Sequence, residues 1–430
     1  LQLRKTETTL EAVQIQRDDA LKRMETFDER ENDLFLQLRS SDRIRRELHN
    51  KVMQLSGNIR VYVRVRPELP FEQDGGETTK PSDSRKRKHD RIESYTTPFK
   101  FPGIFDKETK GGEDLCKNFV EMIEPPKDRG GLKQRTKKWQ FGFDNVFTPT
   151  HGQDEVWEAT EPLVQSAIDG YNVCIFAYGQ TGSGKTYTML GDKSNQGIIF
   201  RAVQKIFSAK KETETLSKGK TTVSLSLELL EIYNENVRDL LADGEKQKLK
   251  VTSNEVVGSK IVPANSSDQV MEVLELAQSR RCVKATRSNA ESSRSHMVFT
   301  IHYKVSSPDK GANMQGKLHI CDLAGSERLN KSGANTSGDG SLLKETQNIN
   351  SSLSTLSNVI ERLQQGSANI PFRESKLTML LQNSLGGNSK TLAIVCCNPS
   401  GSHFHESLCS LRFADKVNRV ELKATSNFSC

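Results

Sequence analysis

A glycine-rich segment that ends in a lysine and a threonine is the part of this sequence best suited to chemistry. It fits the phosphate-binding pattern G-x-x-x-x-G-K-[ST] and follows an apolar run at 172–178 that is typical of a buried strand. In such a loop, backbone N–H groups point at phosphate oxygens, Lys185 reaches the β- and γ-phosphates, and the Thr186 hydroxyl holds Mg²⁺. A chance match in a surface loop is the alternative. The residues predicted to bind a nucleotide are Gly179, Gln180, Thr181, Gly182, Ser183, Gly184, Lys185 and Thr186.

Two later segments supply the other groups that a phosphate-binding loop needs. A short apolar strand ends at Asp322, where a P-loop enzyme holds its Mg²⁺ shell, here through water. Gly325 follows and offers an unobstructed backbone N–H to a γ-phosphate, so this loop is predicted to sense that phosphate. The other segment, 289–296, is rich in hydroxyls and contains Arg294, which can pair with Glu327 and lock the two loops together. Taken alone, a serine-rich loop is equally typical of turns and caps.

These three segments together resemble the P-loop, switch I and switch II of a kinesin motor domain, in the same order and with similar spacing. Several long motifs are more specific than any single one, and the resemblance covers about residues 58–422. Further stretches that are similar to kinesin motifs lie at 58–67, 371–378, 384–391 and 410–414.

The resemblance implies roles for residues that the P-loop pattern alone does not assign. Arg64, Arg66 and Pro67 would border the adenine of ATP or ADP, and the ring of Tyr187 would stack near the base. Ser293 would help to position water and Mg²⁺. The Arg294–Glu327 pair would close for hydrolysis, so the catalytic set is Ser293, Arg294, Gly325 and Glu327.

Apolar runs alternate with helical stretches through the same region. Such alternation around a P-loop predicts an α/β fold, a P-loop NTPase whose central, mostly parallel sheet has helices on both faces. Helices are expected, for example, at 153–170 and 269–284. Strands are expected at 140–146, 174–178, 222–233, 298–305, 317–322 and 391–397.

Residues 1–56 contain neither glycine nor proline and have the composition of a long helix. Apolar residues recur every seven positions in two rows, which predicts a coiled-coil stalk that forms a homodimer or a heterodimer; a single solvated helix is the alternative. One row holds Val13, Ala20, Phe27, Leu34, Leu48 and Leu55. The other holds Leu3, Leu10, Met24, Leu38 and Val52. The rows are interrupted by Arg17, Glu31, Ser41 and Arg45.

The expected domains are the coiled coil at 1–56, a motor domain at 57–422 and a tail at 423–430. Within the motor domain, residues 70–138 are polar and rich in charge, which indicates a loop insertion around small strands. Its basic run at 85–91 is compatible with nuclear import, with a contact to a phosphate or an acidic surface, or with a solvated loop.

A helix at about 348–365 follows switch II directly. A γ-phosphate contact at Gly325 that forms and breaks can tilt this helix, which faces the microtubule in kinesins. The resemblance also implies that the region around Arg373 and Lys376 faces tubulin. Two basic residues expected in the switch II loop, Lys331 and Lys344, would join them.

The sequence departs from the family on this surface. Ser351 and Leu342 stand where kinesins commonly have basic residues, and the segment 335–340 is longer than usual. Two positive charges are therefore missing from the surface expected to face the track. With fewer positive charges on this surface, a weakly motile or non-motile ATPase that crosslinks microtubules is the alternative to a motor.

The stalk precedes the motor core, and about ten residues follow Asn418. By resemblance, this order predicts a C-terminal-motor kinesin that moves toward the microtubule minus end, and the chain is expected to be a fragment of a longer protein. The predicted cofactors are ATP or ADP and Mg²⁺, and the partner is the microtubule. The expected location is the cytoplasm and its microtubule cytoskeleton, for which the spindle is one alternative. A nucleic-acid ATPase is the third alternative, and it explains neither the stalk nor the segment 371–378.

Composition sets broader limits. The net charge of +7 and the pI near 8.8 suit an acidic partner, and charge alone does not choose between nucleic acid, membrane and an acidic protein surface. By resemblance, the acidic surface of tubulin is expected, and neither nucleic acid nor membrane is. There is no apolar run long enough to span a bilayer. The eight cysteines contain no C-x-x-C pair and are expected to be reduced, and His403 and His405 are too isolated to predict a metal site.

Overall fold

The computed structural model describes most of the chain and divides it into two compact units, Leu1–Ser56 and Gly57–Cys430. No helix among the described residues has the length and apolar character needed to cross a membrane. The described residues are 2–55, 57, 59–69, 72, 97–102, 118–125, 136–242, 249–252, 255–283, 293–307, 312–327, 340–387 and 389–420.

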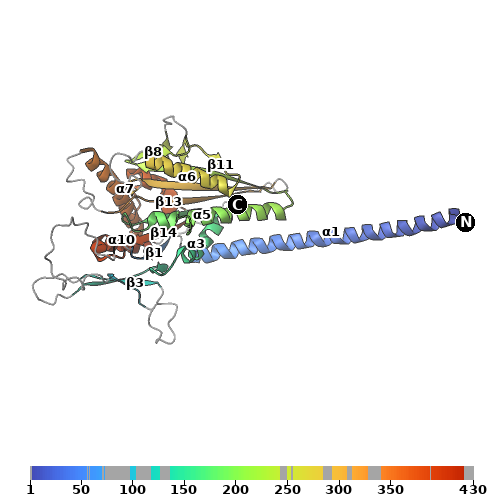
Figure 1. Ribbon diagram of the computed structural model, residues 1–430, viewed down its shortest axis with the longest axis horizontal. Coiled ribbons are helices and arrows are strands. Elements are labelled where there is room, and N and C mark those ends of the chain that lie inside the picture. Colours follow the sequence, from blue (N-terminus) through green and yellow to red (C-terminus); the bar gives the residue numbers. More distant parts are fainter. Residues whose placement is uncertain are drawn as a thin grey trace, which may run out of the picture. The chain divides into compact units, whose positions relative to one another are not determined.

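The first unit is a single helix, α1 (Gln2–Leu55), drawn in blue in Figure 1. Large apolar side chains along it are open to solvent: Leu10, Met24 and Phe27 are 61%, 62% and 69% exposed. A helix of 54 residues whose apolar stripe stays in water lacks the packing that normally stabilises helices in proteins. The two-row pattern therefore leaves a face that a second helix can cover.

The second unit is built on a nine-stranded sheet formed by the described residues (Figure 1). Its order is β11-β7-β12-β13-β6-β14-β1-β5, with β8 paired to β7. The strands are β1 (Ile59–Val65), β5 (Asn145–Phe147), β6 (Asn172–Tyr178), β7 (Thr222–Tyr233), β8 (Asn236–Asp239), β11 (Val262–Pro263), β12 (His296–Ser307), β13 (Ala312–Asp322) and β14 (Lys390–Cys397).

The sheet is mixed, and most of its strands point the same way. The ladders among β13, β6, β14, β1 and β5 are parallel, and β7 has the same direction because two antiparallel ladders separate it from β13. Among the described strands of this sheet, only β12, β8 and β11 run the other way. The prediction of a mostly parallel sheet is confirmed. The central strand β6 is apolar at almost every position because both of its faces are covered.

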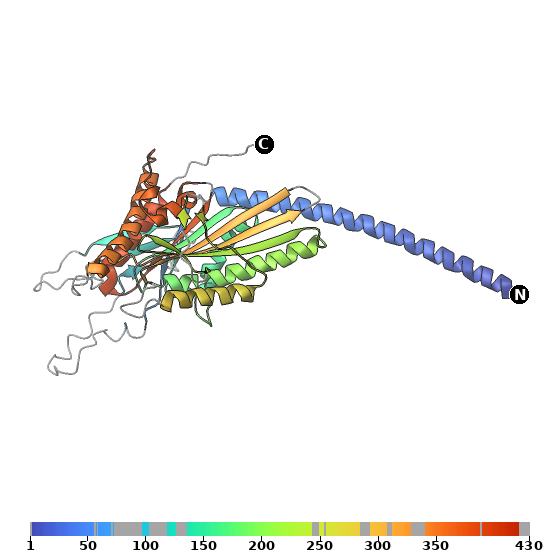
Figure 2. The same ribbon diagram turned by 90° about the horizontal axis from the view of Figure 1, so that it is seen from above.

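Helices cover both faces of the sheet. On one face, α3 (Gln153–Ile168) packs on β6 and β13, α5 (Ile198–Leu216) packs on β7, and α6 (Ser267–Val283) lies beside α5 (Figure 2). On the other face, α10 (Phe404–Asn418) packs on β1 and β14, and α7 (Gly340–Gln364) packs on α10. Alternate residues of the strands, such as Val63 and Phe176, join Leu356 and Leu411 in the core of this second face.

Short elements complete the unit. The helical ones are α4 (Lys185–Met189), η4 (Phe372–Glu374), α8 (Lys376–Leu380), α9 (Gln382–Gly386) and η5 (Gly401–His403). The strands β2 (Phe99–Lys100), β3 (Phe119–Ile123) and β4 (Lys138–Gly142) form a separate antiparallel sheet, and β9 (Lys250–Val251) pairs with β10 (Val256–Val257). Small strands were expected within 70–138, and β2 and β3 lie there, whereas β4 only begins at the end of that stretch. The basic run at 85–91 lies outside the described residues.

Two expected boundaries are wrong. A single strand was predicted at 140–146, but β4 ends at Gly142 and β5 starts at Asn145 in another sheet. Asp144 lies between them, and its carboxylate accepts a hydrogen bond from the N–H of Val61 at 2.7 Å, which fixes the turn. The helix expected from 348 instead begins at Gly340, so Lys344 lies on α7 and not in the switch II loop.

Candidate functional site

The phosphate-binding motif forms the turn between β6 and α4. Gly179, Gly182 and Gly184 have φ angles of +145°, +76° and +95°, which side-chain-bearing residues rarely adopt. A Cβ on Gly179 would also lie 2.2 Å from the carbonyl oxygen of Cys396 on β14. The glycines therefore allow the backbone to turn sharply against a neighbouring strand, as the sequence predicts.

Most residues predicted to bind the nucleotide line one cavity of about 610 Å³. The end of β1 and the residues after it contribute Arg64, Arg66 and Pro67, and α4 contributes Tyr187, a residue that is 41% exposed. Ser293 from switch I and Leu323 from switch II close the cavity. The remaining lining residues are Leu69, Thr181, Gly182, Ser183, Gly184, Lys185, Thr186 and Thr188.

Lys185 is buried beneath the loop. Its Nζ donates to the carbonyl oxygens of Gly179 and Gln180, both at 2.9 Å. Burial lowers the pKa of this ammonium, and the nearby carboxylates of Asp322 and Glu327 oppose that shift. A phosphate at this position would be an anionic partner for the buried Lys185 ammonium. This favours an anion-binding role for Lys185.

Asp322 ends β13 close to α4. Its Oδ2 accepts a hydrogen bond from the Thr186 hydroxyl at 2.7 Å. Its Oδ1 is buried and has no hydrogen-bond partner among the residues that the structure describes. Burial raises the pKa of this carboxyl, while the charge of Lys185 opposes the rise. A buried carboxylate oxygen with spare acceptor capacity is what a water-filled cation shell requires.

Two further buried oxygens around the loop lack a partner among the described residues: Oε1 of Gln180 and Oγ of Ser183. Buried polar atoms are normally satisfied, and unsatisfied ones indicate strain or a missing ligand. Together with Asp322 Oδ1, they gather around the phosphate-binding loop, which supports a polar ligand there.

Arg64 and Arg66 are held by different partners. Arg64 is buried and donates to Gln153 Oε1 and Thr188 Oγ1, both at 2.9 Å, with its guanidinium 5.6 Å from the centre of the Tyr187 ring. Burial lowers the pKa of Arg64. Gln153, at the start of α3, also donates from Nε2 to the carbonyl oxygen of Tyr187. Sequence reasoning missed Gln153, because no local pattern links it to the P-loop.

Arg66 contacts the P-loop directly. Its Nε donates to the carbonyl oxygen of Gly182 at 2.7 Å, and its other nitrogens bond both carboxylate oxygens of Glu72. The Arg66 guanidinium holds the pKa of the Glu72 carboxyl at about 2. Glu72 was also missed by sequence reasoning, since it lies in a stretch interpreted as loop insertion.

The two switches lie side by side at the end of one antiparallel hairpin. Switch I leads into β12 and switch II leaves β13, and Met297 pairs with Asp322. The N–H of Gly325 donates to the carbonyl oxygen of Ser293 at 2.8 Å. The expectation that this N–H is unobstructed is therefore wrong, because the backbone of switch I already accepts its hydrogen bond. A γ-phosphate would have to replace that carbonyl.

Glu327 contacts the P-loop. Its carboxylate accepts hydrogen bonds from the N–H and hydroxyl of Thr181 at 2.8 and 2.6 Å, and the neighbouring Ser326 N–H donates to Gly179. The pair between Glu327 and Arg294 that we expect in the closed state stays a prediction. Residues 289–292 of switch I lie outside the described residues.

The predicted microtubule-binding residues are spread over two regions. Arg373 is exposed in η4, and Lys376 begins α8, with its backbone N–H bonded to Glu235 Oε2 at 2.8 Å. Lys344 lies on α7, and Lys331 lies outside the described residues. Ser351 is exposed on α7.

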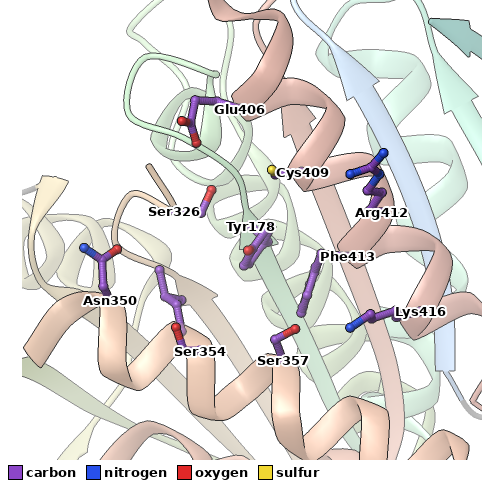
Figure 3. A pocket seen from close by; sticks show the side chains of 11 residues that line it. Tyr178, Ser326, Asn350, Ser354, Ser357, Glu406, Cys409, Arg412, Phe413 and Lys416 are labelled. Atoms are coloured by element: carbon purple, nitrogen blue, oxygen red, sulfur yellow. The ribbon is translucent and has the colours of Figure 1, made fainter. Parts of the chain in front are cut away.

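A second cavity, of about 590 Å³, lies between switch II, α7 and α10 (Figure 3). Ser326 enters it from switch II, while Asn350, Ser354 and Ser357 enter it from α7 (Figure 3). The rings of Tyr178 and Phe413 stack beside it with centroids 3.9 Å apart. The cavity thus connects the end of the P-loop strand with the two helices on this face.

The sheet, the P-loop and the two switches define a P-loop NTPase. The family model described as "Kinesin motor domain" matches residues 64–420, and the chain therefore belongs to the kinesin family. Kinesin motor domains are microtubule-stimulated ATPases that bind and hydrolyse nucleotide.

Known relatives and solved structures agree with this assignment. The chain is 42% identical over 394 residues to "Kinesin-like protein KIFC1" of Homo sapiens, with 87% of this chain and 54% of that protein covered. It is 40% identical over 390 residues to "Kinesin-like protein KIN-14G" of Arabidopsis thaliana, with 88% and 35% covered. The chain thus spans about a third to a half of these relatives.

Among solved structures, it is similar to the "C-terminal motor and motor homology domain of Kar3Vik1 fused to a synthetic heterodimeric coiled coil". The TM-score is 0.76 at 34% sequence identity, and the match covers 96% of this chain and 98% of that chain.

Proposed function

We propose that this chain is the motor part of a kinesin that couples ATP hydrolysis to movement toward the microtubule minus end. The observation that carries the proposal is the P-loop site whose switch II backbone bonds both to the P-loop and to switch I. Minus-end direction is supported by the helix that precedes the motor unit and by similarity to a protein described as a C-terminal motor.

The site fits Mg²⁺ as part of the bound nucleotide. Thr186 and Ser293 would hold the ion, and Asp322 would hold it through water, since hydroxyl and carboxylate oxygens are the ligands that Mg²⁺ prefers. The unpartnered Asp322 Oδ1 supports this assignment. When bound, the ion would neutralise part of the negative charge of the phosphates.

The other side chains have separate roles in this proposal. Lys185 would supply the positive charge at the phosphates, and Tyr187 would stack near the base between Arg64 and solvent. Arg294 and Glu327 would close the site, which requires the Glu327 carboxylate to leave Thr181. Arg373, Lys376, Lys344 and Lys331 would face tubulin.

A dimer through α1 is the second part of the proposal, and charge favours a heterodimer. In a parallel coiled coil of two identical chains, each residue of a seam row faces its own copy. Arg17, Glu31 and Arg45 lie in the row that holds Leu10 and Leu38, so a homodimer would place three pairs of like charges in its seam. A partner with the opposite charges at these positions would turn all three into attractive pairs.

A gliding assay with polarity-marked microtubules tests the proposal. Surface-bound chain should move microtubules with their plus ends leading, and movement with minus ends leading contradicts the proposed direction. Binding without movement in the presence of ATP would favour the alternative of a crosslinking ATPase, for which the uncharged Ser351 on α7 is the supporting observation.

A further inference from the structure

His296 connects switch II to α7 through its two ring nitrogens. The residue begins β12, and its side chain is only 3% exposed. Its Nδ1 accepts a hydrogen bond from the N–H of Ala324 in switch II at 3.0 Å, and its Nε2 lies 3.0 Å from the Oγ of Ser352 on α7. One side chain therefore bridges the nucleotide-sensing loop and the helix on the far side of that loop.

The hydrogen bonds fix the state of the ring. A backbone N–H can only donate, so Nδ1 carries the lone pair that accepts from Ala324. Burial, together with the charges of Arg281 and Lys185, lowers the pKa of His296 to about 3, which leaves the ring neutral at physiological pH. The single ring proton is then on Nε2, and Nε2–H donates to Ser352.

The bond to Ala324 is adjacent to the contact that a γ-phosphate would disturb. Ala324 donates to His296, and the next residue, Gly325, donates to the carbonyl oxygen of Ser293. The two acceptors lie close together in the chain, since Ser293 precedes β12 and His296 is its first residue. If a phosphate takes the N–H of Gly325, the peptide that carries this amide must move, and Ala324 must move relative to His296.

His296 itself is held firmly. It pairs with Ile232 of β7, and β12 has long ladders to both β7 and β13. Ser352, its partner on α7, is 2% exposed and lies near the middle of the helix, beside the buried Leu353. This connection does not depend on residues 328–339, through which the chain runs from switch II to α7.

We propose that His296 is a positioning residue that couples the amides of switch II to α7, with Ser352 as the point about which the helix turns. A helix held near its middle to a rigid strand rotates about that point, so its two ends move in opposite directions. The inference rests on the proposed function, in which α7 faces the microtubule and switch II responds to the γ-phosphate.

Ser352→Ala is the main test variant. It removes the hydroxyl that His296 contacts and places the best helix former on α7, so the helix should persist. His296→Asn removes the bond between residues 296 and 352 by changing the other partner. The asparagine side chain is shorter, so it can accept the hydrogen bond from the Ala324 N–H but cannot reach Ser352. Ser354→Ala is the matched control, since Ser354 is an exposed serine two residues further along the same helix.

The first measurement is the ratio of microtubule-stimulated to basal ATPase of the full chain. Ser352→Ala should keep its basal rate and lose about five-fold in the ratio, the effect of one net hydrogen bond. The double variant with His296→Asn should lose no more than the larger single effect, because both substitutions remove the same link. An unchanged ratio in Ser352→Ala, with an unchanged Tm, would overturn the proposal.

The second measurement needs no microtubules. Hydrogen exchange of α7 is compared between ADP and a non-hydrolysable ATP analogue. The wild-type chain should show a difference that Ser352→Ala diminishes and Ser354→Ala retains; equal differences in all three chains, or none in the wild type, would overturn the coupling. A wild-type chain that shows this difference but no microtubule stimulation would instead contradict the proposed function alone.

Discussion

The carboxylate of Glu327 accepts two hydrogen bonds from Thr181, one from the backbone N–H at 2.8 Å and one from the hydroxyl at 2.6 Å. Gly325 lies so close to this contact that a Cβ there would be 2.3 Å from Glu327 Oε2 and 2.4 Å from Thr181 Oγ1. The carboxylate cannot pair fully with Arg294 while it holds Thr181. The contact between Glu327 and Thr181 therefore competes with the closed state of the switches.

Replacing Glu327 by alanine should spare ATP binding and remove hydrolysis, because the pair with Arg294 is needed only in the closed state. Thr181→Ala is the contrasting variant: it loses the hydroxyl bond that competes with closure but keeps the backbone N–H. Binding of a fluorescent ATP analogue and single-turnover hydrolysis should be measured for both. Wild-type turnover in Glu327→Ala would refute the role of this carboxylate.

Lys185→Ala should abolish ATP binding or turnover, because among the described residues no other ammonium lies beneath the P-loop. Lys185→Arg provides a control that keeps the charge but not the shape of the group. Equilibrium nucleotide binding and steady-state ATPase are the measurements. ATPase activity that survives in the alanine variant would show that the nucleotide lies elsewhere.

Ser351→Lys should tighten microtubule binding by a few-fold at most, since an exposed ion pair contributes about 0.2–1 kcal/mol. Ser351→Glu should weaken it, and both effects should fade as salt is raised. Cosedimentation at two ionic strengths gives the affinities. Equal affinities of all three chains at low salt would mean that this position of α7 does not face the lattice.

Acid should destabilise the motor unit well above the pH at which carboxylates titrate. Burial lowers the pKa values of His296, His302 and His319 from 6.5 to about 3, 4 and 3. Below pH 6.5, these three rings therefore stay neutral in the folded protein, whereas the same rings take up protons in the unfolded chain. Their stabilising contribution is complete above pH 6.5 and is lost as the pH falls from 6.5 to the folded-state pKa values of about 4 for His302 and about 3 for His296 and His319.

The size of this effect can be checked with one variant. Each such histidine lowers the free energy of unfolding by up to about 1.4 kcal/mol per pH unit in this window. His319→Gln cannot take up a proton and should reduce the slope by that amount. Urea unfolding between pH 7 and pH 5 measures it, and parallel slopes for the two chains would contradict the assignment of a buried neutral histidine at 319.

The seam charges of α1 predict selective pairing. A copy of the full chain that carries Arg17→Glu, Glu31→Arg and Arg45→Glu should pair with the native chain at least about ten-fold more tightly than the native chain pairs with itself, because three repulsive contacts become attractive. Sedimentation equilibrium of each chain and of the mixture tests this. A native homodimer as tight as the mixed dimer would rule out the proposed preference.

The sequence was most informative where one motif determines the local geometry. The P-loop between β6 and α4 and the full span of β7 follow from glycine spacing and from apolar runs. The start of α7 was missed by eight residues because Gly340 and Ser341 have low helix propensity, and tertiary contacts are invisible in a local pattern. The same limit explains why Gln153 and the contact between Glu327 and Thr181 were not foreseen.

The hairpin of β12 and β13 has a mechanical consequence for the switches. Its two strands are paired without interruption from Ser307 and Ala312 at one end to Met297 and Asp322 at the other. Switch I enters, and switch II leaves, at that second end, so both are attached to the same twisted ribbon. A torsional change in the ribbon would rotate the two attachment points together, so Ser293 and Leu323, on the side of the nucleotide cavity that the switches form, would move as one body rather than as separate loops.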